Sequence, residues 1–383
     1  MSKMQRVGHY VPGSIAADKY QAYIPKPLPP IPPLDLGEIY TLLDQANSAL
    51  GRLDGMSIVL PDATLFLYMY VRKEAVLSSQ IEGTQSSLSD LLMFENAEIP
   101  GVPIDDVTEV SCYVSAMDYG LERIKTLPLS LRLIKEIHEK LMDNSRGGNK
   151  QPGEFRRTQN WIGGDKPSKA KFVPPPPEHL IESLDKLEKF LHDDNVKLPA
   201  LVKAALVHVQ FETIHPFLDG NGRLGRLLIT LILCTEGLLK QPLLYLSLYL
   251  KKHREDYYNF LQSVRETGDW EEWIKFFLTG VIETANQATD TAKSIMSLFE
   301  SDKKRLELEA KGASAILVIH NYLQRHPLTT TSKIKAECNL VLPTVLRSLK
   351  ILETMGIVKE VTGKKRHKVF VYKEYLRLLN DGV

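Results

Sequence analysis

One stretch of twelve residues, from His215 to Arg226, gathers the side chains of this chain that are most suited to chemistry. It reads His-Pro-Phe-Leu-Asp-Gly-Asn-Gly-Arg-Leu-Gly-Arg. Gly220 and Gly222 permit a tight turn that leaves backbone N–H groups free to bind an anion at the start of a helix. Arg223 and Arg226 lie on one helical face, and each can fork onto phosphate oxygens. The stretch therefore predicts a site for more than one phosphate.

Two further side chains of this stretch suit a reaction at a bound phosphate. Asp219 supplies a carboxylate for a divalent cation such as Mg²⁺, since hard cations take oxygen ligands. The imidazole of His215, with an ordinary pKa near neutrality, can take a proton from an attacking hydroxyl. Taken singly, a Gly-Asn-Gly turn or a histidine before proline is more often structural. The whole string is far more specific than its parts.

The elements that position this stretch are two apolar segments on either side of it. Residues 200–211 have helical periodicity, and residues 224–239 are long and apolar enough for a buried helix. A polar loop between two buried helices is therefore predicted. Residues 84–150 are expected to continue as helices, among them 106–125 and 131–141, without chemistry of their own.

The string resembles the signature of the Fic family of protein adenylyltransferases, His-x-Phe-x-(Asp/Glu)-Gly-Asn-Gly-Arg-x-x-Arg. The residues that match its defined positions are His215, Phe217, Asp219, Gly220, Asn221, Gly222, Arg223 and Arg226. The resemblance implies transfer of AMP from ATP to a Ser, Thr or Tyr hydroxyl of a target protein and of the chain itself, with release of pyrophosphate. Phe217 would anchor the loop in the core.

The resemblance also implies a role for each polar residue. His215 would be the general base, and Asp219 the ligand of Mg²⁺. Asn221 and the glycine amides would hold the α- and β-phosphates, Arg223 would contact the β-phosphate, and Arg226 would hold the γ-phosphate. The predicted nucleotide-binding residues of this stretch are Asp219, Gly220, Asn221, Gly222, Arg223, Leu224, Gly225 and Arg226.

A second motif lies upstream, at the end of a helix predicted over about residues 62–82 that begins at a Pro-Asp pair. The helix ends at Gly83, which is the usual C-terminal stop, so a simple cap is the ordinary interpretation. The run Ser78-x-x-x-Glu82-Gly83 also resembles the family's inhibitory motif, (Ser/Thr)-x-x-x-Glu-(Gly/Asn). The resemblance implies that Glu82 pairs with Arg226, takes the place of the γ-phosphate and holds ATP in a pose unsuited to attack.

Two more segments are assigned by the same resemblance. Residues 151–177 hold two short β-prone runs around a turn, which predicts a hairpin. In the family this flap aligns the target by strand addition, and the residues that would cover the nucleotide are Asn160, Trp161, Ile162 and Gly163. Tyr257 and Tyr258 are predicted near the adenine, whereas Tyr245 and Tyr249 fit the core equally well. Arg265 stands where some relatives carry an asparagine, so no contact is assigned to it.

The composition is that of an ordinary globular protein. The chain has 383 residues, 43% of them hydrophobic and 25% charged, with a formal net charge of +1. This length favours about two or three domains. Three widely separated cysteines predict a reducing compartment without disulfides. The opening residues show no signal sequence, and no apolar run approaches the ~20 residues of a membrane span, so we expect a cytoplasmic protein.

The two ends of the chain differ in character. The proline-rich residues 1–36 are expected to form an extended arm along their own domain. Residues 313–383 carry 12 Lys and Arg against 5 Asp and Glu, a formal +7. Helices are predicted there at 314–325, 331–337 and 342–354, and strands at 357–361 and 368–372. This order resembles a winged helix-turn-helix. Arg347, Lys350 and the basic hairpin tip suit DNA phosphates, while protein docking or dimerisation is equally open.

These observations predict a mainly α protein with a Fic-type helical core, a small β-hairpin flap and a C-terminal winged helix-turn-helix domain. The expected domains are an N-terminal arm and helical region with the inhibitory helix (1–104), the catalytic core (105–293), a charged connector helix (294–312) and the winged-helix domain (313–383). The predicted function is a self-inhibited protein adenylyltransferase, with ATP, Mg²⁺ and a protein hydroxyl as partners and a homodimer as its assembly. One alternative is removal of AMP or transfer of another nucleotide or phosphate group. Another is a DNA-binding regulator with a nucleotide-sensing core, although the intact His215 argues against that as the sole function.

Overall fold

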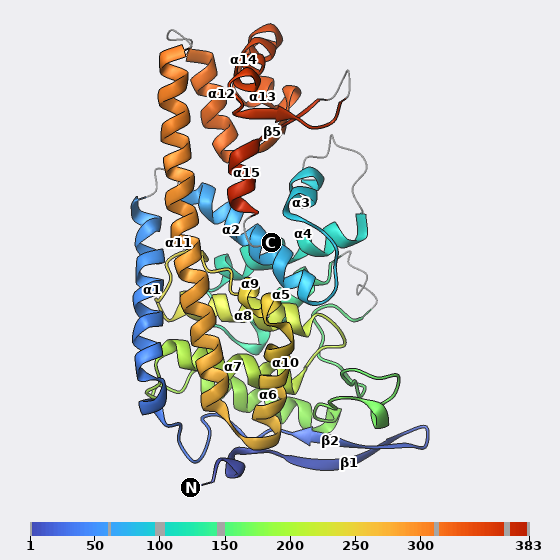
Figure 1. Cartoon of the computed structure of the whole chain (residues 1–383). Coiled ribbons are helices and arrows are strands. Elements are labelled where there is room, and N and C mark those ends of the chain that lie inside the picture. The colour runs from blue at the N-terminus through green and yellow to red at the C-terminus, as the bar shows by residue number, and fades with distance from the viewer. Residues whose placement is uncertain are drawn as a thin grey trace.

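Helices make up most of the computed structural model, which describes residues 2–59, 63–95, 104–143, 150–309, 314–363 and 368–380 (Figure 1). The helices before residue 270 are α1 (Tyr40–Val59), α2 (Ala63–Ile81), α3 (Leu88–Phe94), α4 (Ile104–Arg123), α5 (Leu131–Leu141), α6 (Pro177–Leu191), α7 (Ala200–Ile214), α8 (Asn221–Thr235), α9 (Ser247–Lys252) and α10 (Arg254–Thr267). The later helices are α11 (Trp270–Glu309), α12 (Ser314–Arg325), α13 (Thr331–Glu337), α14 (Leu342–Thr354) and α15 (Lys373–Leu379). The strands are β1 (His9–Ile15), β2 (Asp18–Ile24), β3 (Leu328–Thr330), β4 (Val358–Glu360) and β5 (Val369–Tyr372). The predicted mainly α class is confirmed.

The signature loop lies between two buried helices, as predicted. Helix α7 ends at Ile214, α8 begins at Asn221, and the two helices pack against each other. Nearly all of their side chains are buried, because both sequences are apolar on almost every face. The loop is therefore anchored at both ends in the core.

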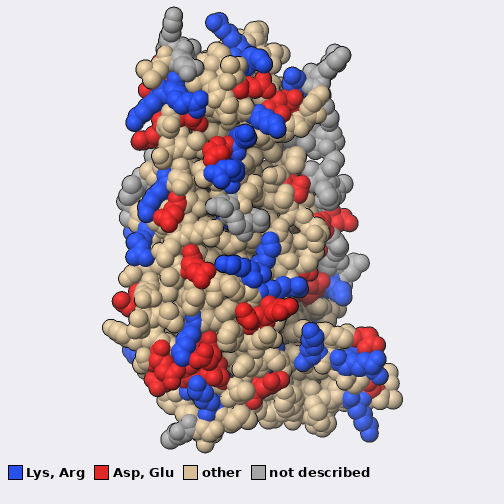
Figure 2. All heavy atoms as spheres, in the orientation of Figure 1, with Lys and Arg blue, Asp and Glu red and all other residues tan. Residues whose placement is uncertain are grey.

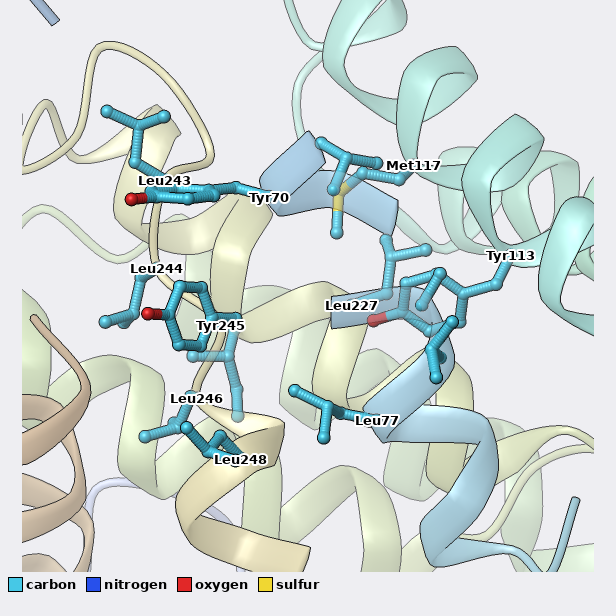
Figure 3. Close-up of a cluster of buried hydrophobic side chains, with 14 of the residues drawn as sticks. Tyr70, Leu77, Tyr113, Met117, Leu227, Leu243, Leu244, Tyr245, Leu246 and Leu248 are labelled. Carbon is cyan, nitrogen blue, oxygen red and sulfur yellow. The ribbon is translucent and has the colours of Figure 1, made fainter. Parts of the chain in front are cut away.

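Helix α2, which ends next to Glu82, is fixed by apolar packing along its length. Figure 3 shows Tyr70 and Leu77 of α2 among side chains from two neighbouring helices and from the segment before α9. Tyr113 comes from α4 and Leu227 from α8, and all four of these side chains are buried. The end of α2 is consequently held at a fixed place beside the start of α8.

The N-terminal arm differs from the prediction. Residues 9–24 form an antiparallel hairpin, in which His9 pairs with Ile24 and Ile15 pairs with Asp18 at the turn. Apart from Pro12, the prolines that suggested an extended arm begin only at residue 25, whereas the residues before them are rich in Tyr, Val and Ile, which favour strands. The proline content of residues 25–33 therefore misled the prediction for the residues before them.

The flap is thinner than the predicted hairpin. A single antiparallel bridge joins Ile162 to Phe172, with the Ile162 amide 2.8 Å from the Phe172 carbonyl. Four consecutive prolines after Val173 lack the N–H groups that would extend the ladder. The Tyr23 amide of β2 donates to the Val173 carbonyl at 2.9 Å, so the N-terminal hairpin covers this side of the flap.

The charged connector predicted at about residues 294–311 is the second half of a much longer helix. Helix α11 runs without interruption from Trp270 to Glu309 and packs along α1 (Figure 1). The predicted boundary at residue 293 falls inside this helix. The domain limits stay a prediction.

The C-terminal unit has the predicted elements. Helices α12, α13 and α14 have the predicted bounds, and β4 and β5 pair in antiparallel fashion. Two elements were not predicted: α15, and the short strand β3, which pairs with β5 and completes a three-stranded sheet. The Tyr372 hydroxyl donates to Asp302 of α11 at 2.7 Å, which ties the unit to that helix.

No helix in the described part of the chain is both long enough and apolar enough to cross a membrane.

Candidate active site

The backbone at His215 is strained and is held by one buried arginine. His215 caps α7 with φ 50° and ψ 61°, a left-handed conformation that is uncommon outside glycine. The Arg156 Nε donates to the His215 carbonyl at 2.9 Å, and its Nη2 donates to the carbonyls of Pro175 and Ile214. Arg156 thus joins the flap segment to the loop. This role could not be predicted from the sequence, because two adjacent arginines occur there and nothing local distinguishes the buried one.

Replacing Arg156 with alanine is expected to lower the free energy of unfolding by about 3 kcal/mol, because several buried carbonyls would lose their donor. The matched control is Arg157→Ala at the neighbouring, exposed arginine, which should change stability by less than about 0.5 kcal/mol. Urea unfolding followed by circular dichroism measures both. Equal stabilities of the two variants would show that Arg156 does not hold the loop.

A second support for the loop comes from α5, in a region to which the sequence assigned no chemistry. His138 stacks on the Phe217 ring with a centroid separation of 3.7 Å. Its Nδ1 accepts from the Gly153 amide at 2.9 Å, so its Nε2 carries the proton and donates to the Asp219 carbonyl at 3.0 Å. Phe217 is fully buried and lies in the core, as the resemblance implied.

Burial lowers the pKa of His138 to about 4, which makes stability depend on pH. Between about pH 4 and the unfolded pKa of about 6.5, the unfolded chain holds a proton that the folded chain does not, so stability falls as pH falls. On going from pH 7 to pH 5, the free energy of unfolding should therefore fall by about 2 kcal/mol less in His138→Gln than in the native chain. Urea unfolding at the two pH values measures this, with His179→Gln as control, since the His179 side chain is 40% exposed. Parallel losses in all three proteins would refute the assignment.

The structure gives Asn221 a different role from the one implied. Its side-chain oxygen accepts from the Phe217 amide and its nitrogen donates to the Phe217 carbonyl, both at 2.9 Å. The amide group therefore closes the loop, and its contact with a phosphate stays a prediction. Leu224 is also structural, since its side chain is buried and its amide donates to the Gly220 carbonyl within the first turn of α8.

The glycines of the loop make room for neighbouring groups. Gly220 has a φ of 75°, which a glycine adopts without strain. A Cβ on Gly222 would lie 2.2 Å from Oε1 of Glu82, and one on Gly225 would lie 2.5 Å from Oε1 of Glu212. Two carboxylates thus approach the start of α8 at positions where a side chain in place of glycine would displace them.

The ion pair implied by the upstream motif is present. The Nη2 of Arg226 lies 2.6 Å from Oε1 of Glu82. Ser78 completes the contact, since its hydroxyl accepts from Nε at 2.8 Å and its carbonyl accepts from Nη2 at 3.0 Å. Gly83 follows with a φ of 105° and ends α2.

The two partners of this pair differ in their access to solvent. The Arg226 side chain is 1% exposed, whereas 38% of the Glu82 side chain is exposed. Burial by itself would raise the pKa of Glu82, but Arg226 outweighs it and holds that pKa below its ordinary value. Glu82 is therefore an ionised carboxylate at the N-terminus of α8, where an anionic ligand would bind.

Arg223 is a buried cation with unused donors. In the described part of the chain, its Nε and Nη1 have no hydrogen-bond partner. The nearest carboxylates are those of Glu109 on α4, 3.5 Å from Nη1, and Asp219, 3.9 Å from Nη2. Buried donors without partners are costly, which indicates a site made for an anion. The sequence assigned no chemistry to α4 and so missed Glu109.

Asp219 fits the role of a ligand for Mg²⁺. Its side chain is 47% exposed, and its Oδ1 accepts from the Gly220 amide at 2.6 Å. Within the described ranges, no group of three or more His, Cys, Asp and Glu side chains could hold a metal by itself. Mg²⁺ does not require such a group, since it keeps several waters and binds through one or two carboxylates together with substrate phosphates.

The tyrosines fall into two classes. Tyr257 is buried and its hydroxyl lies 2.8 Å from Nε2 of His208. Tyr258 is 40% exposed, with Arg254 over its ring, and is the better candidate. Tyr245 and Tyr249 are buried in the core.

The flap residues meet the loop at one point. The Asn160 amide donates to the Phe217 carbonyl at 3.0 Å, while Ile162 makes the bridge and Gly163 turns the chain with a φ of 71°. The Trp161 indole donates within the flap, to the Gly164 carbonyl at 3.4 Å. Arg265 lies 3.9 Å from the centre of the Phe172 ring, and so links α10 to the flap.

Family models match the part of the chain that carries α2, the flap and the loop between α7 and α8. Residues 40–122 match the Fic/DOC family N-terminal model, and residues 128–233 match the Fic/DOC family model. The protein adenylyltransferase Fic of Aedes aegypti is 29% identical over an alignment of 300 residues, which covers 72% of this chain and 56% of that protein. The protein of the same name from Drosophila grimshawi is 30% identical over 241 residues, 61% of this chain and 45% of that protein. The chain spans about half the length of these curated relatives.

Solved structures show the same fold. A Fic family protein from Desulfovibrio desulfuricans G20 has a TM-score of 0.57 and 19% identity, covering 88% of this chain and 96% of that chain. Residues 134–508 of Fic-1 from C. elegans have a TM-score of 0.50 and 23% identity, covering 68% of this chain and 73% of that chain.

Proposed function

This chain carries the N-terminal region and the domain of the Fic/DOC family, and on that basis we propose that it is a protein adenylyltransferase. The observation that carries the proposal is that one loop joins a histidine base to a buried arginine that, within the described ranges, has two nitrogens without a hydrogen bond. His215 ends α7, Arg223 opens α8, and Nε and Nη1 of Arg223 have no hydrogen-bond partner among the described residues. Such donors suit the phosphates of ATP.

The reaction follows from this placement. The oxygen of a Ser, Thr or Tyr hydroxyl attacks the α-phosphorus of ATP, and the bond to the bridging oxygen breaks, so that pyrophosphate leaves. The hydroxyl proton passes to His215. Burial, together with Arg156 and Arg265, lowers the pKa of His215 to about 3, so the ring is neutral and can accept the proton. Arg223 stabilises charge on the phosphates, and the rigid loop supplies positioning. Asp219 would hold Mg²⁺, which when bound neutralises phosphate charge.

The structure supports an inhibited resting state. Arg226 would hold the γ-phosphate, yet its Nη2 already pairs with Glu82. The carboxylate and a phosphate cannot both occupy the start of α8. ATP would therefore bind to this state in an unproductive pose, and release of Glu82 would activate the enzyme.

The test distinguishes which phosphate of ATP is transferred to protein. The full chain and a cell lysate are incubated with Mg²⁺ and with either α-³²P-ATP or γ-³²P-ATP, and label on protein is read from denaturing gels. Transfer of AMP predicts label on protein from the α-phosphate and none from the γ-phosphate. Label from the γ-phosphate would make the chain a kinase. Bound ATP without any label, also after loss of Glu82, would direct attention to other nucleotides and to removal of AMP.

Binding of DNA by the C-terminal unit stays a prediction, as does a homodimer. Helix α14 exposes Arg347 and Lys350 but also Leu342 and Leu346, and Lys350 is paired with Glu353 at 3.2 Å. Figure 2 shows charges of both signs on the visible face of this unit. Fluorescence anisotropy with a labelled duplex tests for DNA, and an affinity that falls steeply with salt would support it. Light scattering on the same sample gives the oligomeric state.

A further inference from the structure

Glu212 is a buried carboxyl that the proposed mechanism leaves unused. It lies in the last turn of α7, one turn before His215, and its side chain is 8% exposed. Its Oε1 has no hydrogen-bond partner among the described residues. A buried carboxyl without a partner is costly, so its presence beside the base calls for an explanation.

The catalytic ring has a matching unused atom. Nδ1 of His215 is buried and likewise has no hydrogen-bond partner among the residues that the structure describes. Oε2 of Glu212 lies 4.0 Å from this nitrogen, so a small side-chain rotation brings the two into hydrogen-bond distance. The backbone carbonyl of Glu212 also acts on the ring and is the competing acceptor.

The neighbouring helix makes room for this carboxyl. Gly225 of α8 faces it, and a Cβ at Gly225 would lie 2.5 Å from Oε1 of Glu212. A residue with any side chain at this position would push the carboxyl away from its present place. The fold thus admits Glu212 beside the ring because α8 has a glycine there.

The charges around the two groups come from four elements. Burial raises the pKa of Glu212 to about 7, against the opposing effect of Arg226 on α8 and Arg265 on α10, and with a contribution from Glu82 after α2. Burial lowers the pKa of His215 to about 3, helped by Arg265 and by Arg156 of the flap segment, while the Glu212 carbonyl and Glu82 act in the other direction. A ring in this setting resists the positive charge that it must carry after it accepts a proton.

We propose that Glu212 is the positioning residue of His215. Its carboxylate accepts a hydrogen bond from Nδ1–H, which fixes the tautomer that leaves Nε2 free as the base. When the hydroxyl proton moves to Nε2, both ring nitrogens carry a proton and the carboxylate stabilises the imidazolium, without itself being protonated. This rests on the proposed adenylyl transfer, in which His215 is the base.

The first test is kinetic and uses the full chain with Glu82→Gly as background, so that inhibition does not mask the effect. Glu212→Gln keeps the shape and removes the charge. We expect kcat to fall on the order of 10²-fold, with KM for ATP changed less than about twofold, because the carboxylate acts in the transition state and not in binding. Glu212→Asp should recover part of the loss. Gly225→Ala, which displaces the carboxyl without removing it, should resemble Glu212→Gln.

The pH profile distinguishes this role from packing. Only the ionised carboxylate stabilises the imidazolium, so kcat should rise with pH through the pKa of Glu212. This rising limb of the kcat–pH profile should be absent in Glu212→Gln. If Glu212→Gln keeps the kcat and the limb of the parent, Nδ1 is held by the Glu212 carbonyl and the proposal is wrong.

A second measurement does not depend on activity. Nitrogen-15 NMR of histidine-labelled full chain reads the tautomer and the pKa of His215, with His215→Ala to assign its signals. We expect Nδ1 to carry the proton in the native chain, and the ring pKa to drop in Glu212→Gln. If adenylyl transfer is absent but these signals change as expected, the contact stands and the proposed function fails. Unchanged signals would overturn the contact whatever the activity, and melting curves confirm that each variant is folded.

Discussion

Replacing Glu82 with glycine is expected to raise the initial rate of adenylyl transfer by at least about tenfold, a barrier change of about 1.4 kcal/mol. The carboxylate lies 2.6 Å from Arg226, at the position proposed for the γ-phosphate. Without it, Arg226 keeps its contacts to Ser78 and can turn to the phosphate. The rate is measured as label transferred from α-³²P-ATP to protein. Glu82→Gln, which keeps most of the side-chain volume but removes the charge, should also activate, though less, because its bulk still fills part of the phosphate site.

The same change should alter how ATP stabilises the protein. Loss of Glu82 leaves the buried guanidinium of Arg226 without its counter-charge, which destabilises the free chain. ATP restores a negative charge at this point, and a ligand that binds the folded state stabilises it by mass action. The rise in Tm on adding ATP should therefore be larger for Glu82→Gly than for the native chain. An unchanged transfer rate together with equal shifts in Tm would rule out Glu82 as the inhibitory group.

Loss of the base is the second large effect. In the Glu82→Gly background, His215→Ala is expected to lower the transfer rate on the order of 10³-fold, within the range for removal of a general base. ATP affinity should change less than about twofold, because the proposed site holds the phosphates through Arg223, Arg226 and the backbone of α8 and not through His215. Isothermal titration gives the affinity, and label transfer gives the rate.

A matched histidine separates this loss from a general effect on the fold. The His179 side chain is 40% exposed at the start of α6, and His179→Ala should leave rate and affinity unchanged. Because the pKa of His215 is lowered to about 3, its protonation should not limit the rate at any pH above about 5. Transfer that survives His215→Ala would remove the histidine from the mechanism.

The features fixed by neighbouring residues could be predicted from the sequence. The turn at Gly220, the helix that follows it, and the three helices of the C-terminal unit depend on backbone dihedrals and on periodicity, which are properties of a short stretch. Two motifs also led to the pair of Glu82 and Arg226, although 144 residues separate them. That contact was implied by the resemblance and not by the local pattern.

The supports of the site came only from the tertiary structure. Arg156 contacts a loop residue 59 positions later in the sequence, and His138 one 81 positions later. Neither stands in a sequence pattern that distinguishes it from a surface residue. The sequence also does not reveal which partners an amide side chain or a tyrosine has. Asn221 bonds to its own loop, and Tyr257 lies buried against His208. Glu212 lies in an otherwise mostly apolar helix, and no sequence pattern marked it as a neighbour of His215. Local residue types determined which groups could do chemistry, whereas burial and partners, which set pKa values and orientation, arise only when distant segments pack together.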